Sequence, residues 1–81
     1  MSIGLYFRDY DAAENFVHYV SDHINTIDLD ELAGIYEHLV GDEDKTEPLF
    51  YVLYVKKNNE TGINYYIILT REIYEGYYKE D

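Results

Sequence analysis

Residues 49–70 read LFYVLYVKKNNETGINYYIILT, and this stretch decides the fold. Its two ends, Leu49–Lys57 and Ile63–Thr70, are rich in branched and aromatic residues, which pack well on a pleated surface. The residues between them, Asn58–Gly62, end in a glycine that suits a left-handed turn. The stretch predicts an antiparallel hairpin whose strands are apolar on both faces, with a core on one face and tyrosine cover on the other.

A first amphipathic helix is predicted upstream of the hairpin, over about Ala12–Asn25. Asp11 and Glu14 have the spacing of a capping box, in which an acceptor at the N-cap is followed three residues later by Glu or Gln. The apolar residues behind this box recur at helical spacing: Ala13, Phe16, Val17, Val20, Ile24 and Ile27.

A second helix is predicted over about Leu29–Val40. Asp28 and Glu31 form a second capping box, and Ile27 and Leu32 have the spacing of a hydrophobic staple around it. The glycine after Val40 is a typical C-terminal stop. The connection between the two predicted helices is short, so they must turn sharply against each other.

The two ends of the chain complete the predicted fold. Ser2–Arg8 alternates with a period of two, which predicts a first strand with one buried face. The tail, Arg71–Asp81, favours a short C-terminal helix, although Gly76 counts against it. The order strand, helix, helix, strand, strand predicts one α+β domain over residues 1–81. We expect a three-stranded, mainly antiparallel sheet with both helices on one face.

The net charge of −11 is the strongest functional signal in the sequence. Residues 1–47 carry twelve acidic and two basic residues, whereas residues 48–81 carry five acidic and four basic ones. Acids three, four or seven residues apart share one helix face, so we expect an acidic ridge. Its expected members are Asp11, Glu14, Asp22, Asp28, Asp30, Glu31, Glu37, Asp42, Glu43, Asp44 and Glu47. Such clustering destabilises a compact chain by self-repulsion, which favours a role in binding.

Seven of the eleven tyrosines lie on the predicted hairpin strands or in the tail, and they form two groups. Those on the predicted strands are expected to cover the sheet: Tyr51, Tyr54, Tyr65 and Tyr66. Those in the tail, where core positions are few, are expected to be exposed and to anchor a partner: Tyr74, Tyr77 and Tyr78. Tyrosine suits this role because it buries much area at little cost in conformational entropy.

Several function classes are disfavoured. The acid excess argues against direct binding to nucleic acid or to an anionic membrane. The sequence has no cysteine, no phosphate-binding glycine loop and no hydrolase or calcium-loop motif, and His18, His23 and His38 lack metal-ligand spacing. We therefore expect no catalysis, no cofactor and no metal site. Without a signal peptide or membrane-spanning run, we expect a soluble cytoplasmic protein.

In its short length, acid excess, lack of cysteine and Tyr-, Ile-, Asn-, Asp- and Glu-rich, alanine-poor usage, the chain resembles small acidic inhibitors from phages and mobile elements. These groups include anti-CRISPR proteins, anti-restriction proteins and uracil-DNA glycosylase inhibitors. The resemblance covers the composition and layout of the whole chain, and no motif carries it. It implies a non-catalytic inhibitor in a bacterial host cytoplasm, whose DNA-mimicking face occupies the basic nucleic-acid-binding surface of a nuclease or a CRISPR or restriction effector.

Two other functions stay open on the same residues. The chain would equally suit an immunity protein or antitoxin that neutralises a basic toxin. It would also suit an acidic regulatory module with no nucleic-acid-binding partner, in which the charge serves solubility alone. The sequence does not predict an oligomeric state.

Overall fold

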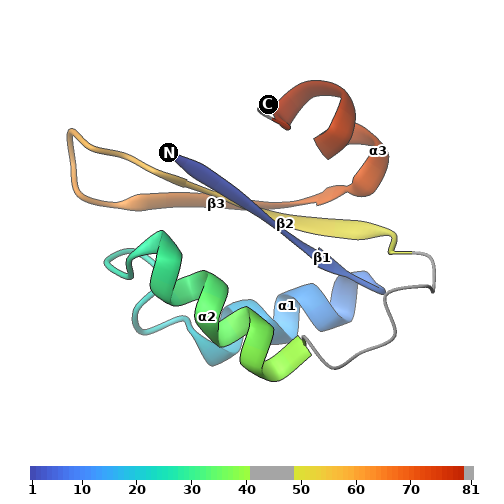
Figure 1. Ribbon diagram of the computed structural model, residues 1–81, viewed down its shortest axis with the longest axis horizontal. Helices are drawn as coiled ribbons and strands as arrows, with labels where there is room; N and C mark the ends of the chain where they lie inside the picture. The colour runs from blue at the N-terminus through green and yellow to red at the C-terminus, as the bar shows by residue number, and fades with distance from the viewer. Residues whose placement is uncertain (41–48, 80–81) are drawn as a thin grey trace.

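The computed structural model describes residues 1–40 and 49–79 and shows helices on both faces of one sheet (Figure 1). The strands are β1 (Ser2–Phe7), β2 (Tyr51–Lys57) and β3 (Asn64–Thr70). They lie in the order β1-β2-β3, and both pairings are antiparallel. This arrangement confirms the predicted α+β fold with its β-α-α-β-β order.

Two helices, α1 (Tyr10–Tyr19) and α2 (Leu29–Val40), cover one face of the sheet, as predicted (Figure 1). The opposite face is covered by α3 (Arg71–Ile73), which continues into one turn of π-helix, η1 (Tyr74–Tyr78). We call residues 9–40 the helical layer and residues 71–79 the C-terminal segment. The short C-terminal helix favoured by the sequence is therefore present.

The larger core lies between the sheet and the helical layer. Strand alternation places Leu5 and Phe7 of β1 and Leu53 and Val55 of β2 on this face. The helical layer contributes the rest of the cluster: Ala13, Phe16, Val20, Ile24, Ile27, Leu29, Leu32 and Tyr36. Burial of each large apolar side chain contributes about 1.5–3 kcal/mol, so this cluster is the main source of stability.

A smaller core lies on the opposite face, under the C-terminal segment. It consists of Val52, Tyr54, Leu69 and Tyr74. The Tyr74 ring lies directly over Gly4, where the Cβ of any other residue would overlap the ring. Glycine at this position of β1 is therefore what lets the C-terminal segment approach the sheet. This second core explains why β2 is apolar on both faces.

The predicted boundaries of the first helix are wrong at both ends. The N-cap is Asp9, whose Oδ1 accepts the backbone N–H of Ala12 at 2.7 Å, and Asp11 lies inside the first turn. The strand before the helix ends at Phe7, so a cap at Asp9 leaves the shortest connection. The helix ends at Tyr19, not Asn25, and residues 20–26 form successive turns.

Asn64, the first residue of β3, holds the segment that follows α1 against the sheet. Its buried side-chain amide donates to the carbonyls of Ile24 and Ile27, at 2.9 and 2.8 Å. Its backbone N–H donates to the carbonyl of Asn25 at 3.2 Å. Three carbonyls of this segment thus bond to the first residue of β3.

The hydrophobic staple of the second helix and the hairpin turn are confirmed, and of the second capping box the structure shows the bond to Asp28. Asp28 Oδ1 accepts the backbone N–H of Asp30 at 2.9 Å at the start of α2, and both staple residues are buried in the larger core. Gly62 closes the hairpin with a φ of 73°, the left-handed conformation expected of it. The predicted helix stop at Gly41 lies outside the described residues.

Candidate functional site

The helical layer carries one sign of fixed charge. Residues 9–40 contain eight acidic residues and no Lys or Arg. All eight are solvent-exposed: Asp9, Asp11, Glu14, Asp22, Asp28, Asp30, Glu31 and Glu37. Five of them lie on the two helices, which bury their apolar faces against the sheet, and the other three lie at the cap of α1 and between the helices.

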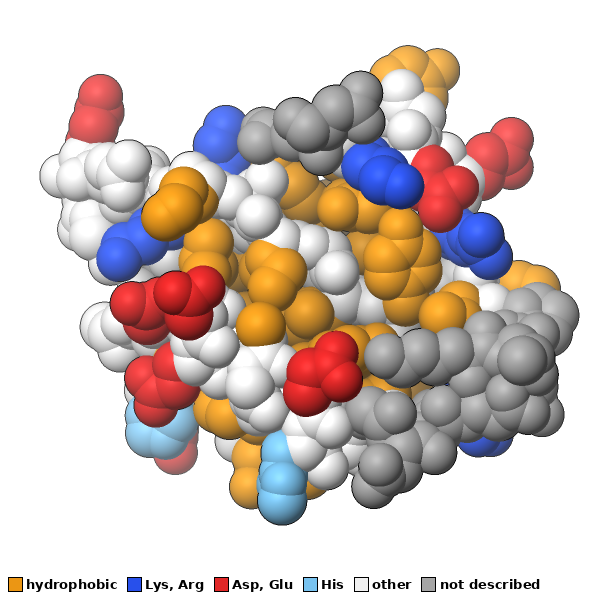
Figure 2. All heavy atoms as spheres, viewed as in Figure 1, with side chains coloured by type: hydrophobic (Ala, Val, Ile, Leu, Met, Phe, Trp, Pro, Cys, Tyr) orange, Lys and Arg blue, Asp and Glu red, His pale blue; other side chains and the backbone are white. Residues whose placement is uncertain are grey.

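This charge is poorly offset from within the layer. His18 Nε2 lies 3.9 Å from Glu14 Oε1, one helical turn away, and this pair carries opposite charges only when the histidine is protonated. Figure 2 shows acidic side chains over the helical layer, with further ones near both ends of the upper half. The Lys and Arg side chains in this view lie mainly along the sheet and the C-terminal segment. The molecule therefore has an acidic side and a mixed side.

Seven of the eleven predicted ridge residues lie in the helical layer and are exposed. They are Asp11, Glu14, Asp22, Asp28, Asp30, Glu31 and Glu37. The other four lie outside the described residues: Asp42, Glu43, Asp44 and Glu47. Asp9 is an eighth acid of the layer that the sequence argument missed, because it was assigned to the connection before the helix and not to the cap.

The tail tyrosines do not lie beside these acids. Tyr74 is only 9% exposed and packs on the sheet, so its predicted role as an exposed anchor is wrong. Tyr77 is 86% exposed and Tyr78 is also exposed, but both belong to the C-terminal segment on the opposite face (Figure 1). A single flat partner surface cannot contact the helical layer and these two tyrosines together.

Two of the four strand tyrosines are buried or half-buried, as predicted, and two are exposed. Tyr54 is buried, with its ring 6.0 Å from that of Tyr74 and 5.2 Å from that of Tyr78, and Tyr51 is half-buried. Tyr65 and Tyr66 are exposed, contrary to the predicted sheet cover. They lie on β3, which is an edge strand, and therefore have neighbours on one side only.

The two helices also carry three large exposed apolar side chains, Tyr10, Tyr19 and Leu39, and the last two lie together. Tyr19 on α1 is 69% exposed and Leu39 on α2 is 46% exposed. Both line a cavity of about 290 Å³ at the helix–helix contact, together with Phe7, Ala12, Asn15, Phe16 and Val40. Tyr19 falls outside the apolar spacing used to predict α1, and that misfit was the available signal.

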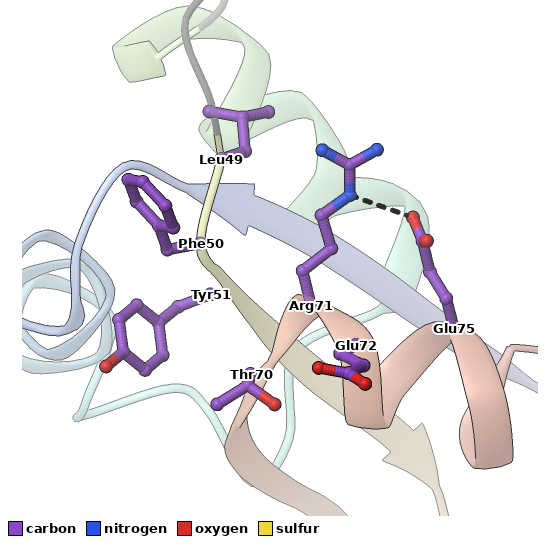
Figure 3. Close-up of a pocket in the computed structure, with 7 residues that line it drawn as sticks. All are labelled: Leu49, Phe50, Tyr51, Thr70, Arg71, Glu72 and Glu75. Atoms are coloured by element: carbon purple, nitrogen blue, oxygen red, sulfur yellow. Dashed lines mark hydrogen bonds and ion pairs between the residues drawn. The ribbon is translucent and has the colours of Figure 1, made fainter.

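A cavity of about 560 Å³ lies where β2 begins and β3 passes into the C-terminal segment (Figure 3). Its lining is Leu49, Phe50, Tyr51, Thr70, Arg71, Glu72 and Glu75. Arg71 Nε donates to Glu75 Oε1 at 3.1 Å, and the hydroxyl of Tyr6 donates to the same oxygen at 3.3 Å. These bonds fix the C-terminal segment to β1, so we assign the charged groups of this cavity to the fold.

Two pKa values reflect this network. The hydrogen bond from Arg71 lowers the pKa of the Glu75 carboxyl, and the positive charge of Arg71 adds to the effect. Burial raises the pKa of the Tyr6 hydroxyl, and the negative charge of Glu75 raises it further. At neutral pH, Glu75 is thus a carboxylate that accepts two hydrogen bonds and Tyr6 is a neutral donor.

In residues 1–40 and 49–79, no three His, Cys, Asp or Glu side chains are grouped so that they could hold a metal ion. Over the same residues, none of the helices has both the length and the apolar character that crossing a membrane requires. No protein-family model, no curated protein and no solved structure matches the chain.

Proposed function

We propose that this chain is a non-catalytic inhibitor that binds the basic nucleic-acid-binding surface of a partner protein through its helical layer. The observation that carries the proposal is the run of eight exposed acids, without Lys or Arg, across residues 9–40 on one side of the sheet. A surface of one sign steers a partner of the opposite sign and accelerates their encounter.

The spacing of the acids supports the choice of a nucleic-acid-binding surface. Asp30 and Glu37 are two turns apart on α2, which separates them by about 10 Å along the helix axis. Phosphates on one DNA strand repeat about every 3.4 Å along the duplex axis, so this separation equals about three phosphate steps. The Lys and Arg side chains that bind phosphates form charge-assisted hydrogen bonds with carboxylates as well.

The proposal is tested by affinity capture from a bacterial host lysate at low and high salt, with mass spectrometry of the eluate. We expect a nuclease or a CRISPR or restriction effector that is retained at low salt and released by high salt and by duplex DNA. Recovery of no basic protein would sink the proposal. Recovery of a toxin encoded beside this chain would instead identify an immunity protein or antitoxin.

Charge-reversal variants locate the binding surface. Asp22→Lys and Glu37→Lys should each slow association with the captured protein several-fold and weaken its salt dependence, because both remove negative charge from the helical layer. Glu72→Lys makes the same charge change in the C-terminal segment and should have a smaller effect. Equal slowing by all three would show that net charge, and not the helical layer, controls association.

A further inference from the structure

The groove between α1 and α2 is apolar although it lies in an acidic layer. Its cavity of about 290 Å³ is lined by aromatic and aliphatic side chains and one amide, and none of the described residues that line it is charged. Residues 9–40 contain Asp and Glu but no Lys or Arg. The groove thus has an apolar floor in a layer whose Asp, Glu, Lys and Arg residues are all acidic, and Arg8 follows Phe7 at the edge of that layer.

Helical spacing forms this groove. Ala12, Asn15, Phe16 and Tyr19 are separated by three or four residues and therefore form one stripe along α1. Phe16 is buried and forms the floor, while Tyr19 and, on α2, Leu39 remain largely exposed. These two side chains are not part of the larger core, so they leave apolar surface that another molecule can cover.

The surrounding charge selects the occupant. An apolar segment without charge would remove water from the neighbouring carboxylates and give them no partner, which is unfavourable. An acidic segment would be repelled. A segment with Lys or Arg on either side of an apolar residue supplies both the cover and the counter-charges. We therefore infer that the groove anchors one apolar side chain of a basic segment of the partner protein.

This inference rests on the proposed function and adds an anchor to it. The cavity lies just below the roughly 300–1,000 Å³ of pockets for drug-sized ligands, which suits one side chain better than a free small molecule. Binding hot spots are typically such pockets, filled by a large side chain and ringed by contacts that exclude water. The anchor also distinguishes the partner's surface from any other dense array of positive charge, since polycations without an apolar residue gain nothing from the groove.

Two synthetic peptides test the inference on the full chain: KRKKFKKRK, and the same peptide with serine in place of phenylalanine. Titration followed by NMR should show that the phenylalanine peptide binds about tenfold more tightly and shifts the resonances of Ala12, Tyr19 and Leu39. Equal affinity for the two peptides would contradict the inference that the groove binds an apolar side chain. If that equal binding were still sensitive to salt, the proposed function would stand without it.

Variants then locate the anchor. Leu39→Gln removes an apolar wall at similar size, so the preference for phenylalanine should disappear while the serine peptide binds as before. Tyr77→Ser, on the opposite face, should leave the preference intact, and the amide spectra of both variants show whether the fold is kept. A preference that survives in Leu39→Gln would overturn the assignment to this groove. Equally tight binding of the neutral peptide SSGSFSGSS would overturn the basic character of the segment.

Discussion

The helical layer and the C-terminal segment cover opposite faces of the same sheet, but they do so in different ways. The helical layer closes a core that extends across two helices and two strands, whereas the C-terminal segment closes a small one centred on one tyrosine ring over a glycine. Among Asp, Glu, Lys and Arg, the helical layer has only acids, whereas the C-terminal segment mixes Arg71 and Lys79 with Glu72 and Glu75. One cover therefore holds the fold together and carries the charge, and the other shields the remaining face of the sheet.

The largest expected effect comes from emptying the larger core. Leu32 is completely buried between α2 and the sheet, so Leu32→Ala should lower the free energy of unfolding by about 2–5 kcal/mol. Leu69→Ala, in the smaller core, should cost less because its cavity is nearer the surface. Urea unfolding monitored by circular dichroism measures both. A larger loss of unfolding free energy in Leu69→Ala than in Leu32→Ala would contradict the view that the larger core is the main source of stability.

A smaller effect is expected from Gly4→Ala, which places a methyl group in the volume of the Tyr74 ring. The free energy of unfolding should fall by about 1–3 kcal/mol, the usual cost of overpacking. Hydrogen exchange should increase in the C-terminal segment and stay unchanged in the helical layer. In a Tyr74→Ala background, Gly4→Ala should lower the free energy of unfolding by almost nothing further. An equally large loss in that background would show that the added methyl group does not act through the Tyr74 ring.

Gly34→Ala should change stability in the opposite direction. This glycine lies in the middle of α2, and an added Cβ would meet nothing within 4 Å. Alanine is the better helix former, so the free energy of unfolding should rise by about 0.5–1 kcal/mol. Thermal unfolding is sufficient to detect the change. A loss of stability would mean that the outer surface of α2 is less open than described here.

The smallest effect concerns the titration of Glu75. Because its pKa is lowered in the folded chain, its carboxylate stabilises the fold above the range where an ordinary glutamate titrates, near pH 4. This contribution is lost as the pH falls through the lowered value. An NMR titration of the side-chain carboxyl should show the pKa returning toward normal in Arg71→Gln and moving less in Tyr6→Phe. An unchanged pKa in Arg71→Gln would remove Arg71 as the cause.

The fold was largely predictable because its elements depend on local patterns. The alternation in β1, the hairpin with Gly62 and the cap at Asp28 each act through neighbouring residues. The turns after α1 were not predictable, because they bond to Asn64, which follows Ile24 by forty residues. The start of α1 was predicted two residues late, because the capping-box spacing of Asp11 and Glu14 was followed and the N-cap is Asp9.

The candidate site was only partly predictable for the same reason. The charge of the helical layer follows from composition and helical spacing alone. The C-terminal segment packs over Gly4. Because glycine has no side chain, the sequence pattern did not indicate this contact. The groove beside Tyr19 and Leu39 depends on how two helices cross, which no single helix pattern contains.

The central position of β2 in the sheet also orders the assembly of the chain. β1 pairs only with β2, and the two are joined through more than forty residues that include both helices, whereas β2 and β3 are joined by a short hairpin. Closing the shorter connection loses less conformational entropy. As the polypeptide leaves the ribosome, β1 and the two acidic helices emerge before β2, the strand with which β1 pairs.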